Sequence, residues 1–230
     1  MESNMNNIER PVLAVDVVIF GIIKDSLTVA LNQRDSSPFK GALALPGVAV
    51  RMDETLEVAA RRALAQKAGW PVDIIDEIML DQLATFDALY RDSRGRTVSV
   101  AYMGIVPESF IYSEKTIMKP FDEIPRGSLP FDHNLILETA HNRLKGKMRY
   151  TNIARKFLSE SFRIEELQNV YEAIFKRSIN RANFRNKLLK INMIEQVKVL
   201  TRAVGKKGGR PPHLYRFKRQ EIETVDRDFI

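Results

Sequence analysis

The segment 47–70, GVAVRMDETLEVAARRALAQKAGW, combines a leading glycine, an acidic stretch and a predicted helix in which one face carries no acid. Ala63, Gln66 and Lys67 are spaced by three and four residues, so a helix places them on the same face. Carboxylates at these positions could hold Mg²⁺ against a diphosphate, but a methyl group, a neutral amide and an ammonium group cannot. Glu54 alone is a poor metal site. Because no ion would polarise a phosphoryl oxygen or activate water, the segment predicts binding without hydrolysis.

The same segment resembles the signature of the Nudix hydrolases. That signature consists of Gly, five residues, Glu, seven residues, and then Arg-Glu-apolar-x-Glu-Glu-x-Gly-apolar. With Gly69 and Trp70 at its end, Glu54 and Arg62 fall on the expected Glu and Arg, while the first Gly falls on Val48. The three later Glu positions are the Ala, Gln and Lys described above. The resemblance implies a Nudix fold, and the substitutions imply no catalytic residue and no metal ligand in it.

Length and charge predict two domains with different partners. A chain of 230 residues can form two modest cores. Residues 1–150 contain 18 Lys and Arg against 20 Asp and Glu, whereas residues 151–230 contain 18 against 9. A basic module joined to a nearly neutral one predicts a polyanion as the partner of the second part, the alternative being a solvated basic surface.

Composition also predicts the compartment. The chain has no Cys, which excludes disulfides and thiolate metal sites and fits a reducing compartment. No segment is apolar enough to span a membrane, and residues 1–11 lack the features of a signal peptide. We therefore expect a cytoplasmic, nucleoid-associated protein with no membrane partner.

The hydrophobic pattern predicts an α+β architecture. Strands are expected at 12–20, 27–31, 43–47, 78–86 and 97–106, and helices at about 54–68 and 132–146. Residues 148–160 are expected to continue helically. The second part then predicts helices at about 164–176 and 180–192, a strand at 197–200, a Gly-rich loop and a strand at 213–217. This order resembles a winged helix-turn-helix. We predict a Nudix-like α/β/α sandwich over residues 1–148 and a winged helix-turn-helix over residues 149–230.

The second helix of that unit has a polar face suited to the major groove of DNA. Phe184, Leu188 and Ile191 share the opposite, apolar face. Asn can pair with adenine and Arg with guanine, and cations in a Gly-rich loop can approach phosphates closely. An ordinary amphipathic helix and an unstructured hairpin tip are the alternatives. The predicted DNA-binding residues are Arg181, Ala182, Asn183, Arg185, Asn186, Lys190, Arg202, Lys206, Lys207, Arg210 and His213.

The first domain contains cations and rings that could bind a nucleotide diphosphate through charge-assisted hydrogen bonds and stacking. Arg62 either contacts the ligand or pairs internally with Glu54. Phe39 either stacks on a base or packs locally, and His133 either faces the pocket or begins a helix. Arg94 and Arg96 could reach the ligand or a second subunit. The predicted ligand-binding residues are Arg34, Phe39, Arg51, Glu54, Arg62, Arg94, Arg96 and His133.

The segments 82–102 and 130–144 resemble Nudix proteins that act on ADP-ribose, and GRPPHLYRF at 209–217 follows in a basic winged helix. Together these features resemble the NrtR family, the Nudix-related transcriptional regulators of NAD metabolism in bacteria, over about residues 10–218. The resemblance implies a homodimeric repressor that binds a palindromic double-stranded DNA operator. It also implies ADP-ribose or a related nucleotide diphosphate as effector, with no cofactor required.

Two other classes of function remain open from the sequence. An active Mg²⁺-dependent ADP-ribose pyrophosphatase with an accessory nucleic-acid-binding domain would release AMP. An RNA-binding adaptor would need a platform of aromatic side chains, and none is evident in residues 151–230.

Overall fold

The computed structural model describes residues 10–107, 115–197 and 213–225. These residues form two compact units. The first contains residues 10–19, 29–104 and 115–140, and the second contains residues 20–28, 105–107, 141–197 and 213–225. The predicted DNA-binding residues Arg202, Lys206, Lys207 and Arg210 lie outside the described part of the chain.

The N-terminal part of the described chain is built on one sheet. Its strands are β1 (Val12–Ile23), β2 (Ser26–Gln33), β3 (Leu43–Ala44), β4 (Gly47–Ala49), β5 (Asp81–Phe86), β6 (Thr97–Ile105) and β7 (Ile117–Pro120). The order is β3-β2-β1-β6-β5, with β4 paired to β1 and β7 paired to β2. β1 and β6 form the middle of the sheet and are buried over most of their length. Their β-branched and apolar composition predicted this interior position.

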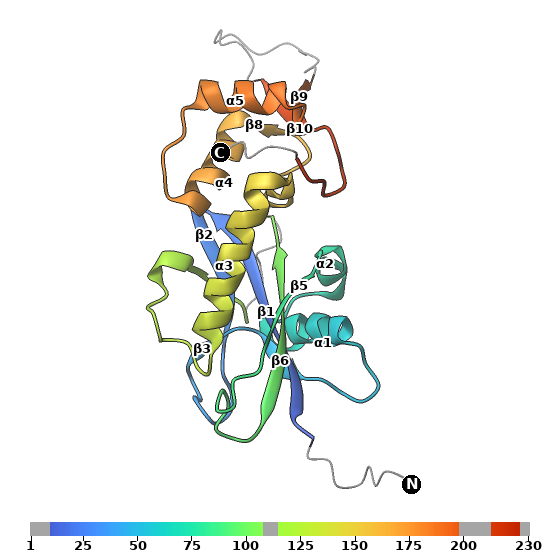
Figure 1. Cartoon of the computed structure of the whole chain (residues 1–230), viewed down its shortest axis with the longest axis vertical. Coiled ribbons are helices and arrows are strands. Elements are labelled where there is room, and N and C mark those ends of the chain that lie inside the picture. The colour runs from blue at the N-terminus through green and yellow to red at the C-terminus, as the bar shows by residue number, and fades with distance from the viewer. Residues whose placement is uncertain (1–9, 108–114, 198–212, 226–230) are drawn as a thin grey trace. The chain divides into compact units, whose positions relative to one another are not determined.

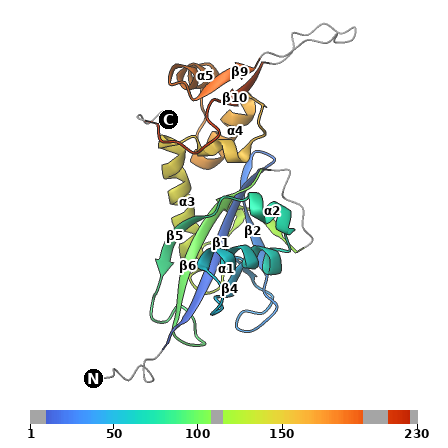
Figure 2. The ribbon, with the colours of Figure 1, turned by 90° about the vertical axis from the view of Figure 1, so that its right-hand side faces the viewer.

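Helices cover both faces of the sheet (Figures 1 and 2). α1 (Leu56–Ala63) and α2 (Val72–Glu77) lie on one side, and the first half of α3 (His133–Tyr150) lies on the other. Because side chains alternate between the two faces of a strand, β1 needs apolar residues in both directions. Its residues Val15, Val17, Val18, Ile19 and Phe20 are all fully buried.

The helix of the motif begins later than its acidic residues indicated. Thr55 is the N-cap, and its hydroxyl accepts a hydrogen bond from Val58 N at 3.3 Å. Glu54 therefore lies outside the helix, where its carboxylate accepts from Arg51 N at 2.8 Å. After α1 the chain continues as a π-helix, η2 (Leu64–Ala68), which ends at Gly69 with φ 69°.

The C-terminal part contains a three-stranded sheet and two helices. After α3 come η5 (Ile153–Phe157), β8 (Phe162–Arg163), α4 (Ile164–Phe175), α5 (Arg181–Lys190), β9 (Ile194–Val197) and β10 (Leu214–Phe217). The sheet order is β8-β10-β9. The prediction of a continuous helix over 148–160 was wrong, because α3 ends at Tyr150 and a short 3₁₀ turn follows. β9 also begins earlier than predicted, directly after Asn192 ends the helical turn with φ 58°.

An aromatic core holds this C-terminal part together. The Tyr171 ring packs edge-on against Phe184, with 5.1 Å between centroids, and joins α4 to α5. Phe162 of β8 and Phe217 of β10 are 5.2 Å apart and join the strands. Phe184 and Leu188 are buried as the sequence predicted. Throughout the described residues, no helix combines the length and apolar character that a bilayer span requires.

Candidate functional site

A pocket of about 740 Å³ opens beside β1 in the first unit. This volume is in the range of small-molecule sites. Its wall comes from β1 and β2, the loop after β2, the motif loop and helix, the turn before β6 and the start of α3. Five of the eight predicted ligand-binding residues line it: Arg34, Arg51, Arg62, Arg94 and His133.

The other three predicted ligand-binding residues lie beside this wall and are not part of it. Phe39 packs edge-on against Phe131, whose ring does line the pocket, at 5.1 Å between centroids. Glu54 is bound to Arg62. Arg96 Nη1 donates to the carbonyl oxygens of Asp87 at 2.7 Å and Ala88 at 3.3 Å, which ties its guanidinium to the chain that follows β5.

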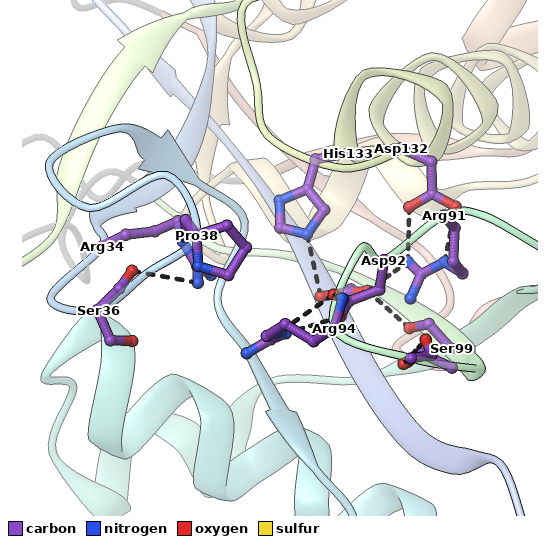
Figure 3. A network of polar contacts seen from close by, with 12 residues as sticks. Arg34, Ser36, Pro38, Arg91, Asp92, Arg94, Ser99, Asp132 and His133 are labelled. Carbon is purple, nitrogen blue, oxygen red and sulfur yellow. Dashed lines mark hydrogen bonds and ion pairs between the residues drawn. The ribbon is translucent and has the colours of Figure 1, made fainter.

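Asp16 is a buried carboxylate of the pocket wall, and its partners Ser99, Arg91 and His133 are labelled in Figure 3. Ser99 Oγ donates to Asp16 Oδ2 at 2.6 Å, and Arg91 Nη2 lies 3.3 Å from the same oxygen. His133 Nε2 lies 3.4 Å from Asp16 Oδ1, while His133 Nδ1 accepts from Leu45 N at 3.1 Å. The backbone donor fixes the histidine tautomer with its proton on Nε2, directed at the carboxylate. His133 therefore begins α3 and also faces the pocket.

The contacts of Asp16 outweigh the effect of its burial on its acidity. Burial alone would raise the pKa of this carboxyl. Contacts from His133, the hydrogen bond from Ser99 and the charge of Arg91 nevertheless lower it to about 2. Arg91 is itself fixed by Asp132, with its Nε 2.8 Å from Oδ2. The carboxylate is thus an ionised, immobile acceptor in the wall.

Arg62 and Glu54 form the internal pair that was one of the two sequence-based alternatives. Arg62 Nε lies 2.9 Å from Glu54 Oε2, and its Nη2 lies 2.5 Å from Oε1. The same guanidinium donates to Ala49 O at 2.8 Å and to Gln66 Oε1 at 3.2 Å. The hydrogen bond from Arg62 is the main reason that the pKa of Glu54 falls to about 2. This arrangement fixes the motif loop to α1.

Two guanidinium groups flank the ring of Phe131 in the pocket wall. Arg34 Cζ lies 4.9 Å from the ring centroid and Arg94 Cζ lies 5.4 Å from it. Arg34 also donates to Pro38 O at 2.9 Å (Figure 3). Burial, followed by the charge of Arg94, lowers the pKa of Arg34. Both guanidinium groups add positive charge to this part of the pocket wall.

The motif face does not fit the Mg²⁺ that the Nudix signature implies. Ala63 is a buried methyl group, and the amide of Gln66 is bound to Arg62. Lys67 carries a positive charge and contacts Asp35, with Nζ 3.3 Å from Oδ2. Within the described residues, no group of three His, Cys, Asp or Glu side chains could hold a metal ion. The motif face therefore offers too few oxygen ligands for Mg²⁺, and the ammonium group of Lys67 would repel the ion.

Several residues of the pocket wall were not among the predicted ligand-binding residues: Asp16, Asn32, Asp35, Lys67, Arg91, Asp92 and Phe131. A signal existed for Asp16, since it is the one charged residue in the apolar run VLAVDVVIF, and buried charges need partners. A signal also existed for Lys67, which is a cation on the motif face. Phe131 carried none, because its place depends on the left-handed turn at φ 55° before α3.

In the C-terminal unit, α5 presents the face that was predicted to contact DNA. Asn180 caps the helix by accepting from Asn183 N at 3.0 Å. The side chains of Ala182, Asn183, Asn186 and Lys190 are exposed, and that of Arg185 is half-buried.

Arg181 and His213 have partners within their own unit. Arg181 Nε donates to Gln168 Oε1 of α4 at 3.0 Å, and its Nη1 pairs with Glu165. His213 Nδ1 lies 2.6 Å from Gln196 Nε2 of β9. Both side chains thus tie neighbouring elements together at positions predicted to contact DNA.

Comparison with known proteins places both units in one family. The sequence matches a model described as the NrtR DNA-binding winged helix domain over residues 154–217, and a NUDIX domain over residues 11–123. It is 31% identical over 220 residues to the "ADPR responsive transcriptional repressor NtrR" of Acinetobacter baylyi, an alignment that covers 93% of this chain and 84% of that protein. The chain belongs to the NrtR family.

Solved structures of the NrtR family agree with this membership. Shewanella oneidensis NrtR complexed with a 27mer DNA superposes with a TM-score of 0.73 at 31% identity, covering 90% of this chain and 93% of that one. The NUDIX domain of the same protein, complexed with ADP ribose, matches with a TM-score of 0.52 at 29% identity, covering 62% of this chain and 94% of that one. The predicted α+β fold, a Nudix domain followed by a winged helix domain, is confirmed.

Proposed function

We propose that this chain is a DNA-binding transcriptional repressor of the NrtR family whose Nudix domain binds ADP-ribose as its effector. One observation carries the proposal: a winged helix of the NrtR type follows a Nudix domain whose pocket is lined by cations and has no metal-binding face among its described residues. The Acinetobacter relative is named as an ADPR-responsive repressor, and the Shewanella protein has been solved with DNA and, as its NUDIX domain, with ADP ribose.

The pocket supports a nucleotide diphosphate as ligand. Its volume of about 740 Å³ suits a molecule of that size. Arg34, Arg51 and Arg94 add positive charge to the wall, and Phe131 adds a ring that a base or sugar can contact. We assign Arg62 to the support of the motif loop, since Glu54 and Ala49 O already occupy its guanidinium.

In the proposed DNA complex, α5 lies in the major groove. Asn183, Arg185 and Asn186 would contact base edges, and Ala182 permits close approach. Lys190 would contact phosphates together with four cations that lie outside the described residues: Arg202, Lys206, Lys207 and Arg210. Arg181 and His213 would add phosphate contacts while they stay bound to α4 and β9.

The assembly that we propose is a homodimer on a palindromic operator. Two-fold symmetry in the protein matches two half-sites in the DNA. The proposed domain boundary lies between residues 148 and 149, and the regulated genes are those of NAD metabolism. ADP-ribose can change operator affinity only if it binds the DNA-competent and the released arrangement differently. A coupling of about 1–3 kcal/mol would give a 5–150-fold response.

We further propose that the Nudix domain does not hydrolyse its ligand. The support is the donor chemistry of the motif face, where an amide and an ammonium stand at positions that need anions. Incubation of the purified chain with ADP-ribose and Mg²⁺ should release no AMP above background. Release at an ordinary enzymatic rate, lost in Glu54→Gln, would instead identify a pyrophosphatase.

A gel shift tests both domains at once. Duplex DNA from upstream of the chain's own gene and its neighbours is titrated with protein at fixed salt, with and without ADP-ribose. We expect binding to a specific duplex in the nanomolar range or tighter, and a change in affinity of 5-fold or more with ADP-ribose. Equal affinity for all duplexes would contradict the repressor, and an unchanged affinity with ADP-ribose would contradict the effector.

A further inference from the structure

We propose that the ammonium group of Lys67 is a built-in counter-ion for the diphosphate of the effector, so that effector binding needs no divalent metal. The inference rests on the proposed function and deepens it. Lys67 lines the pocket and stands where the Nudix signature has a glutamate. A diphosphate bound at that position would therefore contact a positive charge without a metal ion.

Lys67 differs from the arginines of the pocket wall in the partner that its side chain contacts. Each of three arginines is paired with a carboxylate that is almost fully buried: Glu54 is 7% exposed, Asp16 is 8% exposed and Asp92 is 6% exposed. Lys67 is paired with Asp35, whose side chain is 74% exposed. Separating a buried pair leaves an uncompensated charge, whereas an exposed pair contributes little and is exchanged cheaply.

A fifth arginine of the wall, Arg51, is exposed in the motif loop, where its charge acts on Glu54. The fourth, Arg34, is occupied by main-chain oxygens. Arg34 donates to Pro38 O and to Ser36 O, at 2.9 Å and 3.4 Å, and so holds the loop after β2. If it turned toward a phosphate, it would give up this support. Lys67 can change partner by rotating a flexible chain at the pocket wall.

Asp35 is then the partner that the diphosphate would displace from Lys67. Its carboxylate lies 3.3 Å from Lys67 Nζ, and the hydrogen bond from Lys67 is the first reason that the pKa of Asp35 lies below its usual value. The Asp35 carboxylate and the diphosphate would compete for the one ammonium group of Lys67. Removal of the negative charge of Asp35, which lines the same wall, should therefore strengthen effector binding.

Isothermal titration of the full-length chain with ADP-ribose tests this inference. We expect wild-type affinity to be the same, within about 2-fold, in EDTA and in millimolar Mg²⁺. Lys67→Gln should weaken binding by about 10- to 100-fold, as expected for loss of one charge-assisted hydrogen bond, and Lys67→Glu should weaken it further. Asp35→Asn should strengthen binding by several-fold.

Two controls separate a local contact from a general change in charge. Lys40→Gln removes one positive charge from an exposed position in the loop that carries Asp35. Lys40 lies outside the pocket wall, so this change should alter affinity by less than 2-fold. In the double variant Lys67→Gln/Asp35→Asn, the gain from Asp35→Asn should disappear, because no ammonium is left to release. A purely structural role for Lys67 would not produce this coupling.

The outcomes distinguish the inference from the proposed function. Binding of ADP-ribose that requires Mg²⁺, or that is equal in wild type and Lys67→Gln, overturns the role of Lys67 and leaves the effector in place. Absence of ADP-ribose binding in both EDTA and Mg²⁺ overturns the effector as well. Thermal melts of each variant verify folding, and all should stay close to wild type because both side chains are at least partly exposed.

Discussion

Gly47 lies so close to Asp16 that a β-carbon on the glycine would be 2.2 Å from Asp16 Oδ1 and 3.0 Å from Val15 O. The close approach follows from strand pairing, since Gly47 of β4 is the register partner of Asp16 in β1. The carboxylate cannot move aside freely, because Ser99 and His133 hold it from other directions. The glycine is therefore required by the buried acid and not by backbone conformation.

Gly47→Ala should destabilise the protein by about 1–3 kcal/mol, the usual effect of extra volume in a packed site. Urea unfolding followed by circular dichroism measures the loss. Gly146→Ala is the matched control: among the described residues, no atom other than those of its chain neighbours and its own helix backbone would lie within 4 Å of the new β-carbon, and the residue lies inside α3. Alanine should stabilise a helix there by about 0.5–1 kcal/mol. A Gly47→Ala protein as stable as wild type would contradict the crowding.

Asp16 should make the stability depend on pH in the acid range. Its folded pKa of about 2 lies below the ordinary value of 3.8, so its ionised form stabilises the fold above pH about 4. This contribution is lost as the pH falls from about 4 to about 2, and it amounts to about 2 kcal/mol. Urea unfolding at pH 7, 4 and 3 measures the decrease.

Asp16→Asn removes this titration and isolates it from that of other carboxylates. The variant should be less stable at pH 7 and should lose less stability between pH 4 and 3 than wild type. Ser99→Ala, a milder change, removes one hydrogen bond and should raise the pKa of Asp16 toward 3.8, so that the variant loses less stability in acid and its loss ends at a higher pH. Parallel curves for all three proteins would show that Asp16 does not titrate as assigned.

How far the sequence predicted the site depended on the range of the interactions. Strands, helices and the polar face of α5 followed from local periodicity, and the unusual motif face was visible at residues 63, 66 and 67. The Lys67–Asp35 contact joins residues 32 apart, and the Asp16–Ser99 contact joins residues 83 apart. No local pattern encodes such pairs, because strand order and loop path decide which side chains meet.

The same limit explains the boundaries that were predicted incorrectly. The acidic residues 53 and 54 favoured an earlier helix start, but Thr55 forms the cap and Glu54 binds Arg62 instead. The ion pair with Arg62, one of the two alternatives that the sequence left open for that arginine, thus keeps Glu54 outside the helix N-terminus to which its acidity had assigned it.

Arg62 should support the motif loop in the absence of any ligand. Arg62→Lys keeps one charge but loses the two-point contact with Glu54 and the bond to Ala49 O. We expect a lower melting temperature and faster hydrogen exchange over residues 49–55. Glu57→Ala, which breaks the exposed pair with Arg61, is the control and should change neither by much. Unchanged exchange in ligand-free Arg62→Lys would assign Arg62 to the ligand.

Substitutions on α5 should separate sequence recognition from phosphate binding. Asn183→Ala and Asn186→Ala remove amides that can contact bases, so each should cost about 1–3 kcal/mol on the operator and little on random duplex. Lys206→Ala and Lys207→Ala, in the loop outside the described residues, should weaken binding to all duplexes and lower the salt slope by about one each.

Asn142→Ala supplies the control for these DNA titrations, because it removes the same amide from an exposed position on α3, outside α5. Fluorescence anisotropy at four salt concentrations yields affinity and slope for each variant. Loss of discrimination in the asparagine variants with an unchanged salt slope would place α5 in the major groove. If instead all four variants behaved as wild type, the C-terminal unit would bind DNA through another surface or not at all.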